Sequence, residues 1–198
     1  LHIPNRLVMI QALDRLLSSP QATSNSLVLI DIDGFAELND TLGHAHGDAL
    51  LQSACTRLQQ GLPAGALLAR ISGDVFAILG RSEDLADEHL LELFQQPLSV
   101  AGLSQRISVT LGMTRLDQVD GQGRDALKAA SIALKHGKQA QRGSVSHFTR
   151  AMEAQTRARV ELLQALRADF EAQRLFLVYQ PQFSLLDNRL IGVEALLR

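Results

Sequence analysis

Two short apolar segments separated by one polar turn constrain the fold of this chain more than any other feature. The segments are residues 67–71 and 75–79, and the turn between them is Ser72-Gly73-Asp74. Apolar runs joined by a glycine-containing turn predict a β-hairpin in which Gly73 adopts a positive φ angle. The hairpin would place Asp74 at its tip.

The segments around this hairpin predict a sheet covered by helices. Residues 27–30 form a continuous apolar run, which is typical of a strand buried on both faces. Residues 107–113 alternate as a half-buried strand does, residues 126–139 have helical periodicity, and Asp48 is expected to cap another helix. The predicted order is helix, strand, helix, helix, hairpin, helix, strand, helix, strand. We therefore expect an α+β fold with a central, mostly antiparallel sheet flanked by helices.

Charge and composition exclude some classes of function. The net charge of −2, with no run of lysine or arginine, argues against a nucleic-acid partner, because a duplex requires a basic face. No apolar run is long enough to span a membrane, so we expect no membrane contact by this segment. The single cysteine, Cys55, fits a buried, inert thiol in the cytoplasm. Because the chain begins abruptly at Leu1, we expect a longer parent that could be membrane-anchored upstream.

A metal site is suggested by two carboxylates at the ends of predicted strands. Asp31 ends the strand 27–30, and Asp74 lies at the hairpin tip, so one edge of the sheet could bring them together. Two close carboxylates both stay ionised when a cation lies between them, and oxygen ligands suit Mg²⁺. The alternative is that both are ordinary turn residues, and on chemistry alone that alternative is favoured.

Six short motifs resemble the GGDEF family of diguanylate cyclases and favour the metal site. They occur in the order that the family has, over nearly all of residues 1–150. The motifs are residues 1–6, Asp31-Ile32-Asp33-Gly34-Phe35, Asn39-Asp40 with Gly43-His44 and Gly47-Asp48, Arg70-Ile71-Ser72-Gly73-Asp74-Val75-Phe76, Lys138 and Arg142. The resemblance implies a nucleotide-cyclase-like fold.

The resemblance also implies a site for GTP with Mg²⁺ or Mn²⁺. Asp31, the Ile32 carbonyl and Asp74 would hold the metal. The implied nucleotide contacts are Asn39 and Asp48 on guanine, Gly73 in the hairpin turn, and Lys138 and Arg142 on the phosphates. In active members two such domains face each other as a homodimer. Each ribose 3′-hydroxyl then attacks the α-phosphate of the other GTP, which yields cyclic di-GMP and pyrophosphate.

Several residues depart from the family pattern at positions that matter for catalysis. Val75 replaces the glutamate of the GGDEF motif, and an apolar side chain can neither bind a metal nor accept a proton. The loss of one such group costs about 10²–10³ in rate, so the catalytic role of Asp74 is impaired. The other departures are Ser72, Ala36, Ser131 and Lys135, together with Pro63 and Ala66 at the RxxD product-inhibition positions.

These departures leave three functions open for residues 1–150. We expect a domain that binds GTP without turning it over and regulates a downstream domain. One alternative is an active or weak diguanylate cyclase, so whether the chain is an enzyme stays open. The other is a nucleotide-free dimerisation module.

The C-terminal part resembles the beginning of an EAL phosphodiesterase. Residues 151–173 predict a long amphipathic linker helix, and residues 174–198 predict two strands. Tyr179-Gln180-Pro181 and Gly192-Val193-Glu194-Ala195-Leu196-Leu197-Arg198 resemble the first strands of that barrel.

The resemblance implies that Glu194 is a metal ligand, that Arg198 contacts a phosphate and that Gln180 lies in the same pocket. A complete barrel needs roughly 250 residues, so residues 151–198 alone cannot be a phosphodiesterase. Cyclic di-GMP would bind only the complete EAL domain of the parent. We expect this segment to be poorly ordered or held by another chain.

Overall fold

The computed structural model describes residues 3–198. The chain divides into two compact units, Leu1–Glu153 and Ala154–Arg198. Part of the opening motif, Leu1 and His2, lies outside the described residues.

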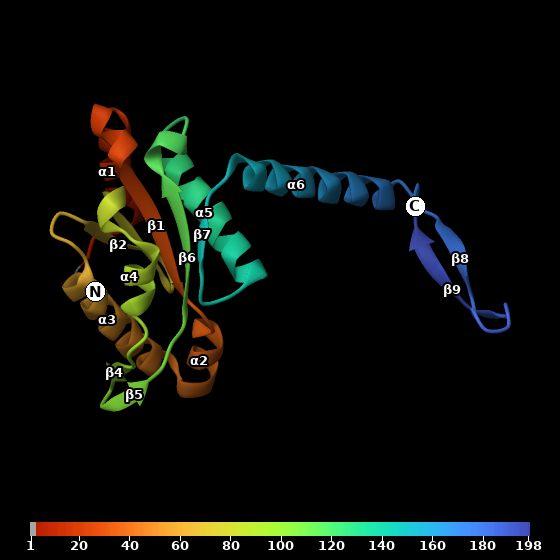
Figure 1. Ribbon diagram of the computed structural model, residues 1–198, viewed down its shortest axis with the longest axis horizontal. Helices are drawn as coiled ribbons and strands as arrows, with labels where there is room; N and C mark the ends of the chain where they lie inside the picture. Colours follow the sequence, from red (N-terminus) through yellow and green to blue (C-terminus); the bar gives the residue numbers. More distant parts are fainter. Residues whose placement is uncertain (1–2) are drawn as a thin grey trace. The chain divides into compact units, whose positions relative to one another are not determined.

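A five-stranded sheet forms the centre of the first unit (Figure 1). Its strand order is β2-β3-β1-β6-β7, and only β6 and β7 pair in parallel. The strands are β1 (Asn25–Ile32), β2 (Leu67–Ser72), β3 (Val75–Arg81), β6 (Val109–Arg115) and β7 (Val145–His147). This topology confirms the predicted α+β class and the hairpin, which is β2 and β3.

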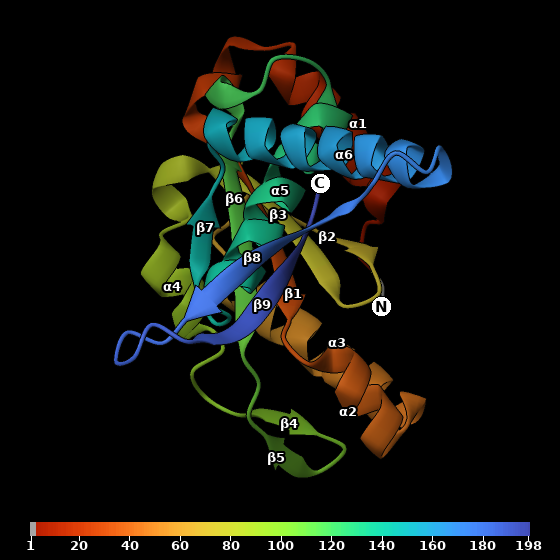
Figure 2. The ribbon, with the colours of Figure 1, turned by 90° about the vertical axis from the view of Figure 1, so that its right-hand side faces the viewer.

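Helices cover both faces of the sheet. Figure 2 shows α5 against the strands of the sheet, and α1 packs on the same face. The helices of the first unit are α1 (Arg6–Leu17), α2 (Phe35–Leu42), α3 (His44–Gly61), α4 (Asp87–Glu92) and α5 (Gly123–Ala140). Short 3₁₀ turns occupy Pro20–Ser24, Ser82–Asp84 and Leu116–Gln118.

Alternation along β1 divides the core into two layers, because successive strand residues point to opposite faces. Val28 and Ile30 pack with α3, α4 and the odd-numbered residues of β6. Leu27 and Leu29 pack with α1 and α5. Asp31 continues this second series, so its side chain points to the α5 face.

The close approach of α5 to β6 depends on Gly112. A Cβ atom at this position would lie 2.2 Å from the backbone nitrogen of Leu134 in α5. Real side chains do not tolerate such a distance, so only glycine permits this packing. Since α5 carries Lys138, the contact also sets where the Lys138 side chain begins.

Two sequence-based expectations about the first unit are wrong. The strand predicted at 107–113 is β6, and it is buried on both faces because α5 covers Thr110, whose polar side chain had indicated solvent. Asp48 does not cap a helix, since α3 begins at His44 after Gly43 and Asp48 lies inside it. A short hairpin of β4 (Leu98–Val100) and β5 (Leu103–Gln105) was not predicted.

The second unit contains the end of α6 (Arg150–Glu171) and an antiparallel hairpin. The hairpin strands are β8 (Leu177–Phe183) and β9 (Leu190–Leu197). Apolar side chains on both elements are exposed, including Leu163 and Phe170 on α6 and Ile191 on β9. Among residues 3–198, no helix combines the length and the apolar character needed to cross a membrane.

Candidate functional site

Asp31 is the central residue of the candidate site. It lies near the end of β1, directly opposite Val75 of β3 and Thr110 of β6. The residue is 5% exposed. One carboxylate oxygen, Oδ2, forms an ion pair with Lys138 Nζ at 2.5 Å. The other oxygen, Oδ1, is buried and has no hydrogen-bond partner among the described residues.

The environment of Asp31 opposes its negative charge. Burial raises the pKa of the Asp31 carboxyl, and the charges of Asp74 and Asp33 raise it further, whereas the bond and charge of Lys138 lower it. A buried oxygen without a partner is costly. A cation beside Oδ1 would supply that partner and offset the repulsion, so this arrangement fits a metal ion.

Asp74 lies beside Asp31 because Val75 pairs with Asp31 in register. The turn before it contains Gly73, whose φ angle of +40° confirms the predicted positive φ. The Arg70 side chain donates a hydrogen bond from Nε to the Gly73 carbonyl at 2.8 Å. The strand end and the hairpin tip therefore meet, as the sequence predicted.

The oxygen ligands at this strand end suit Mg²⁺ better than they suit a metal ion that needs side chains for all of its ligands. Asp31 and Asp74 provide carboxylates, and the Ile32 carbonyl lies at the same end of β1. No group of three or more His, Cys, Asp or Glu side chains within residues 3–198 is positioned to hold a metal ion. Mg²⁺ does not need such a group, since it keeps water or phosphate ligands beside one or two carboxylates. His44 and His46 of α3 belong to no such group within residues 3–198.

Asn39 and Asp48 lie on the helices that follow β1. The Oδ1 atom of Asn39 in α2 is buried and unpartnered in the described part of the chain. The α2 and α3 helices meet at Gly47, where a Cβ atom would lie 1.8 Å from that Oδ1. Asp48 follows Gly47 and is exposed. The exposed carboxylate of Asp48 can accept the N–H donors of a guanine edge, whereas Asn39 Oδ1 faces Gly47 and would have to turn outward to do so.

Lys138 and Arg142 lie at the C-terminal end of α5, in different environments. Lys138 is held by Asp31, with 37% of its side chain exposed. Arg142 lies two residues beyond the last residue of α5 and is exposed. Lys138 would have to leave Asp31 to reach a phosphate, whereas Arg142 is already accessible.

Sequence reasoning missed the residues that support this end of the sheet. Asp33 accepts hydrogen bonds from Ser108 Oγ at 2.8 Å and from Thr110 Oγ1 at 2.7 Å. Asp33 belonged to a recognised motif, but nothing in the sequence indicated its partners. The hydroxyl residues of 107–113 were interpreted as the solvent-facing side of a strand.

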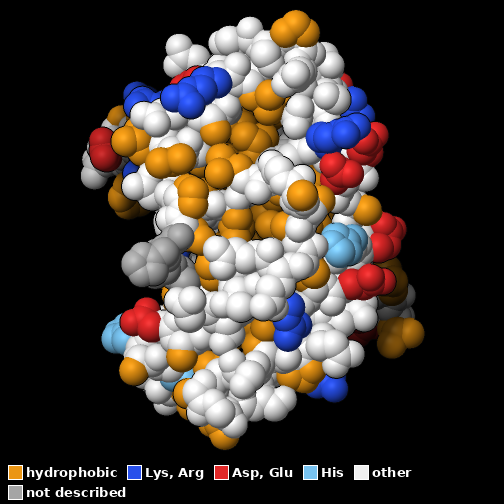
Figure 3. Space-filling view, turned by 90° about the vertical axis from the view of Figure 1, so that its left-hand side faces the viewer, with side chains coloured by type: hydrophobic (Ala, Val, Ile, Leu, Met, Phe, Trp, Pro, Cys, Tyr) orange, Lys and Arg blue, Asp and Glu red, His pale blue; other side chains and the backbone are white. Residues whose placement is uncertain are grey.

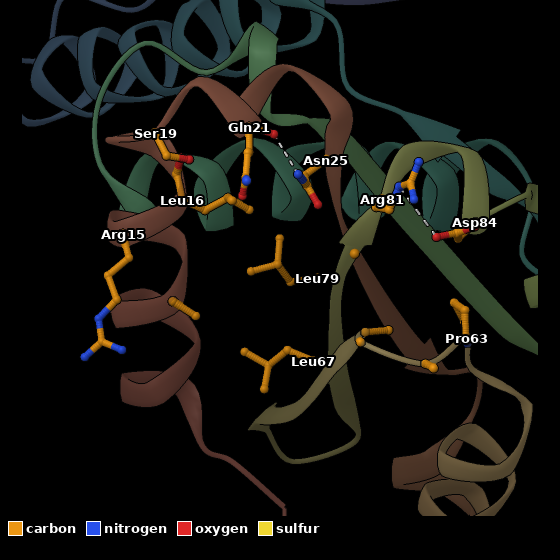
Figure 4. A pocket seen from close by; sticks show the side chains of 15 residues that line it. Arg15, Leu16, Ser19, Gln21, Asn25, Pro63, Leu67, Leu79, Arg81 and Asp84 are labelled. Carbon is orange, nitrogen blue, oxygen red and sulfur yellow. Dashed lines mark hydrogen bonds and ion pairs between the residues drawn. The ribbon is translucent and has the colours of Figure 1, made fainter.

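A separate pocket lies at the other end of the strands. It has a volume of about 530 Å³ and is bounded by α1, the 3₁₀ turn after it and the ends of β2 and β3. Figure 4 shows Leu16, Leu67 and Leu79 around its centre and Arg15 directed away. Figure 3 shows hydrophobic side chains over the upper and central parts of the face that it presents.

This pocket is not the site of the carboxylates. It adjoins the Asn25–Arg81 pair of β1 and β3, and Asp31 lies at the opposite end of that register. Pro63 and Ala66, which the resemblance matches to the RxxD positions, both line it. Neither side chain is charged.

In the second unit, Gln180 and Glu194 are direct cross-strand partners in β8 and β9. The backbone of Arg198 exchanges both of its hydrogen bonds with Phe176 at 2.9 Å. All three residues predicted there are exposed.

Comparison with known proteins relates the whole chain to cyclic di-GMP signalling. Residues 2–144 match the family described as diguanylate cyclase, GGDEF domain. The chain is 32% identical over 204 residues to the bifunctional diguanylate cyclase/cyclic di-GMP phosphodiesterase MucR of Pseudomonas aeruginosa. This match covers 99% of the chain and 30% of MucR. The cyclic di-GMP phosphodiesterase NbdA of the same organism is 28% identical over 181 residues, 87% of this chain and 23% of NbdA.

Solved structures show the same fold. The GGDEF domain of YfiN (TpbB) from Pseudomonas aeruginosa superposes with a TM-score of 0.70 and 27% identity. The superposition covers 78% of this chain and 95% of that domain. The GGDEF domain of DgcB from Caulobacter crescentus, solved in complex with c-di-GMP, has a TM-score of 0.62 and 23% identity over 73% of this chain and 88% of that one.

Proposed function

The chain belongs to the diguanylate cyclase GGDEF-domain family, and on this basis we propose that residues 1–150 bind GTP without converting it efficiently to cyclic di-GMP. The observation that carries the proposal is the contrast at the end of β1. Asp31 keeps an unpartnered oxygen for a cation, while Val75 occupies the position of the family's glutamate directly opposite it.

We assign the binding roles to residues that lie around this strand end. Asp31, the Ile32 carbonyl and Asp74 would hold Mg²⁺ or Mn²⁺, which would offset the charge of the triphosphate. Asn39 and Asp48 would bind guanine, and Gly73 would leave room for the nucleotide at the hairpin turn.

Two cations complete the proposed nucleotide site. Lys138 would move from Asp31 to a phosphate, and Arg142 would contact the phosphates from its exposed position. When Lys138 moves, Oδ2 of Asp31 becomes free to bind the metal ion that arrives with the triphosphate. The partner of the buried carboxylate is thus Lys138 without nucleotide and the metal ion with it.

Cyclisation requires more than binding, and Val75 removes part of what it requires. Valine offers no oxygen to a metal and no base to the 3′-hydroxyl. Ala36, Ser131 and Lys135 depart from the family pattern as well. Asp74 alone would therefore support binding but only impaired catalysis.

The second part of the proposal concerns the longer proteins that the chain resembles. The chain spans 30% of MucR and 23% of NbdA, whose names include a phosphodiesterase. We propose that residues 174–198 begin an EAL domain, in which Gln180, Glu194 and Arg198 belong to the cyclic di-GMP site. The helix 151–173 would connect the two domains. GTP regulates the EAL domain if it favours one of two arrangements of that helix.

GTP with Mg²⁺ is expected to stabilise the first domain against thermal unfolding. At a concentration of 100 times the dissociation constant, the gain is about 2.7 kcal/mol. The melting temperature is measured with GTP and with ATP. Asp48→Ala is the matched variant, because it removes an exposed carboxylate without disturbing the core. We expect stabilisation by GTP only, and its loss in Asp48→Ala. No stabilisation by either nucleotide would favour a nucleotide-free dimerisation module.

A further inference from the structure

We propose that Thr110 is a positioning residue that fixes Arg142 relative to the metal-binding end of β1. This inference rests on the proposed binding of GTP and concerns a residue outside the family motifs. It is carried by a hydrogen-bond relay that connects Asp33 through the Thr110 hydroxyl to the amide of Gly143.

The relay consists of two hydrogen bonds that share the hydroxyl of Thr110. Thr110 Oγ1 donates to Asp33 Oδ1 at 2.7 Å and accepts from the backbone N–H of Gly143 at 3.1 Å. One end is thus attached two residues after Asp31. The other end is attached to the amide that directly follows Arg142.

The hydroxyl lies in the core, because Thr110 is fully buried, whereas Asp33 is half-buried and Gly143 is exposed. Without the hydroxyl, the Gly143 amide and Asp33 Oδ1 would face an apolar group instead of a hydrogen-bond partner, which costs free energy. The turn at this position favours glycine, since its φ angle is +75° and a Cβ atom there would lie 3.0 Å from Ser108 Oγ. The relay therefore holds the Arg142–Gly143 peptide in one place.

The position of Thr110 links the two halves of the proposed site. Thr110 is the register partner of Asp31 on β6, so its side chain points to the same face of the sheet. Asp33 is also held by Ser108 through a second hydroxyl and by a bond from its own amide to the Ser108 carbonyl at 2.9 Å. The carboxylate end is thus doubly fixed. The turn that carries Arg142 is attached to β6 by the bond from Gly143 N–H to Thr110 and, one residue further on, by the bond from Leu111 N–H to the Ser144 carbonyl at 2.9 Å. Thr110 is the attachment nearer to Arg142.

Thr110→Val tests the relay, because it replaces the hydroxyl by a methyl group of similar size. We expect the affinity for Mg²⁺-GTP to fall about tenfold, because the substitution removes one hydrogen bond to a charged group. Thr110→Ser keeps the hydroxyl and should restore the affinity. Ser108→Ala removes the other hydroxyl that donates to Asp33 and leaves the bond between Gly143 and Thr110 in place. The affinity for Mg²⁺-GTP should therefore fall less.

The decisive comparison uses Arg142→Ala as a second background. If Thr110 acts through Arg142, Thr110→Val changes GTP affinity less than about twofold once Arg142 is absent. A purely structural role would give the same loss in both backgrounds and would overturn the proposal. Thr110→Ala gives the same comparison where Thr110→Val does not fold.

The result for the unaltered chain separates this proposal from the function on which it rests. Absence of GTP binding by the unaltered chain would overturn both. Tight binding by the unaltered chain that Thr110→Val leaves unchanged would overturn only the role of Thr110.

Discussion

Replacing Val75 by glutamate is expected to raise cyclic di-GMP formation about 10²-fold, the effect of one electrostatic group in an active site. Val75 lies directly opposite Asp31 and packs with the core cluster on the α5 face. Residues opposite each other in a sheet have side chains on the same face. A carboxylate at this position would therefore join Asp31 and Asp74 and could serve as the missing oxygen ligand or base.

The matched control is Val75→Gln, which has the shape of glutamate without its charge. Product is measured by mass spectrometry at high protein concentration, since cyclisation needs two facing domains. Equal product from Val75→Glu and Val75→Gln would contradict the role given to this position. Ala36 and the other departures stay in place, so the variant is not expected to reach the rate of a fully active cyclase.

Gly112→Ala is expected to destabilise the first domain by about 3 kcal/mol, at the upper end of overpacking costs. The added Cβ would lie 2.2 Å from Leu134 N and 2.4 Å from the Ala130 carbonyl oxygen. Both atoms are backbone atoms of α5, so the whole helix must shift. Since Lys138 lies one turn further along α5, GTP affinity should fall as well.

Gly80→Ala is the matched control for this substitution. Gly80 lies on β3 in the same sheet, and a Cβ atom there would meet its nearest neighbours at 3.5 Å, an ordinary contact. The cost should stay below about 1 kcal/mol. Urea denaturation measures both free energies of unfolding. Similar costs for the two variants would show that the close approach of α5 is not what requires Gly112.

The sheet could be predicted because its signals are local. The apolar run at 27–30 and the hairpin at Ser72-Gly73-Asp74 are sufficient for β1, β2 and β3. The errors concern residues whose environment is set by distant segments. Thr110 is buried because α5 approaches Gly112, and Asp48 lies within α3 because that helix begins five residues earlier than the capping pattern suggested.

The candidate site was predictable to a similar extent. The meeting of Asp31 with Asp74 follows from a strand end beside a hairpin tip. The ion pair between Asp31 and Lys138 does not, because motifs assign Lys138 to a phosphate and say nothing about its partner without nucleotide. The relay through Thr110 was hidden for a related reason, since a hydroxyl in an alternating strand indicates solvent.

The central claim is GTP binding without efficient cyclisation, and product analysis tests it most directly. The purified chain is incubated at high concentration with GTP and Mg²⁺ or Mn²⁺, and cyclic di-GMP and linear pppGpG are measured by mass spectrometry. The account predicts product close to the level of an Asp74→Ala control. Clear product above this control would contradict it, because Val75 would then be compatible with catalysis and the chain would be an active diguanylate cyclase.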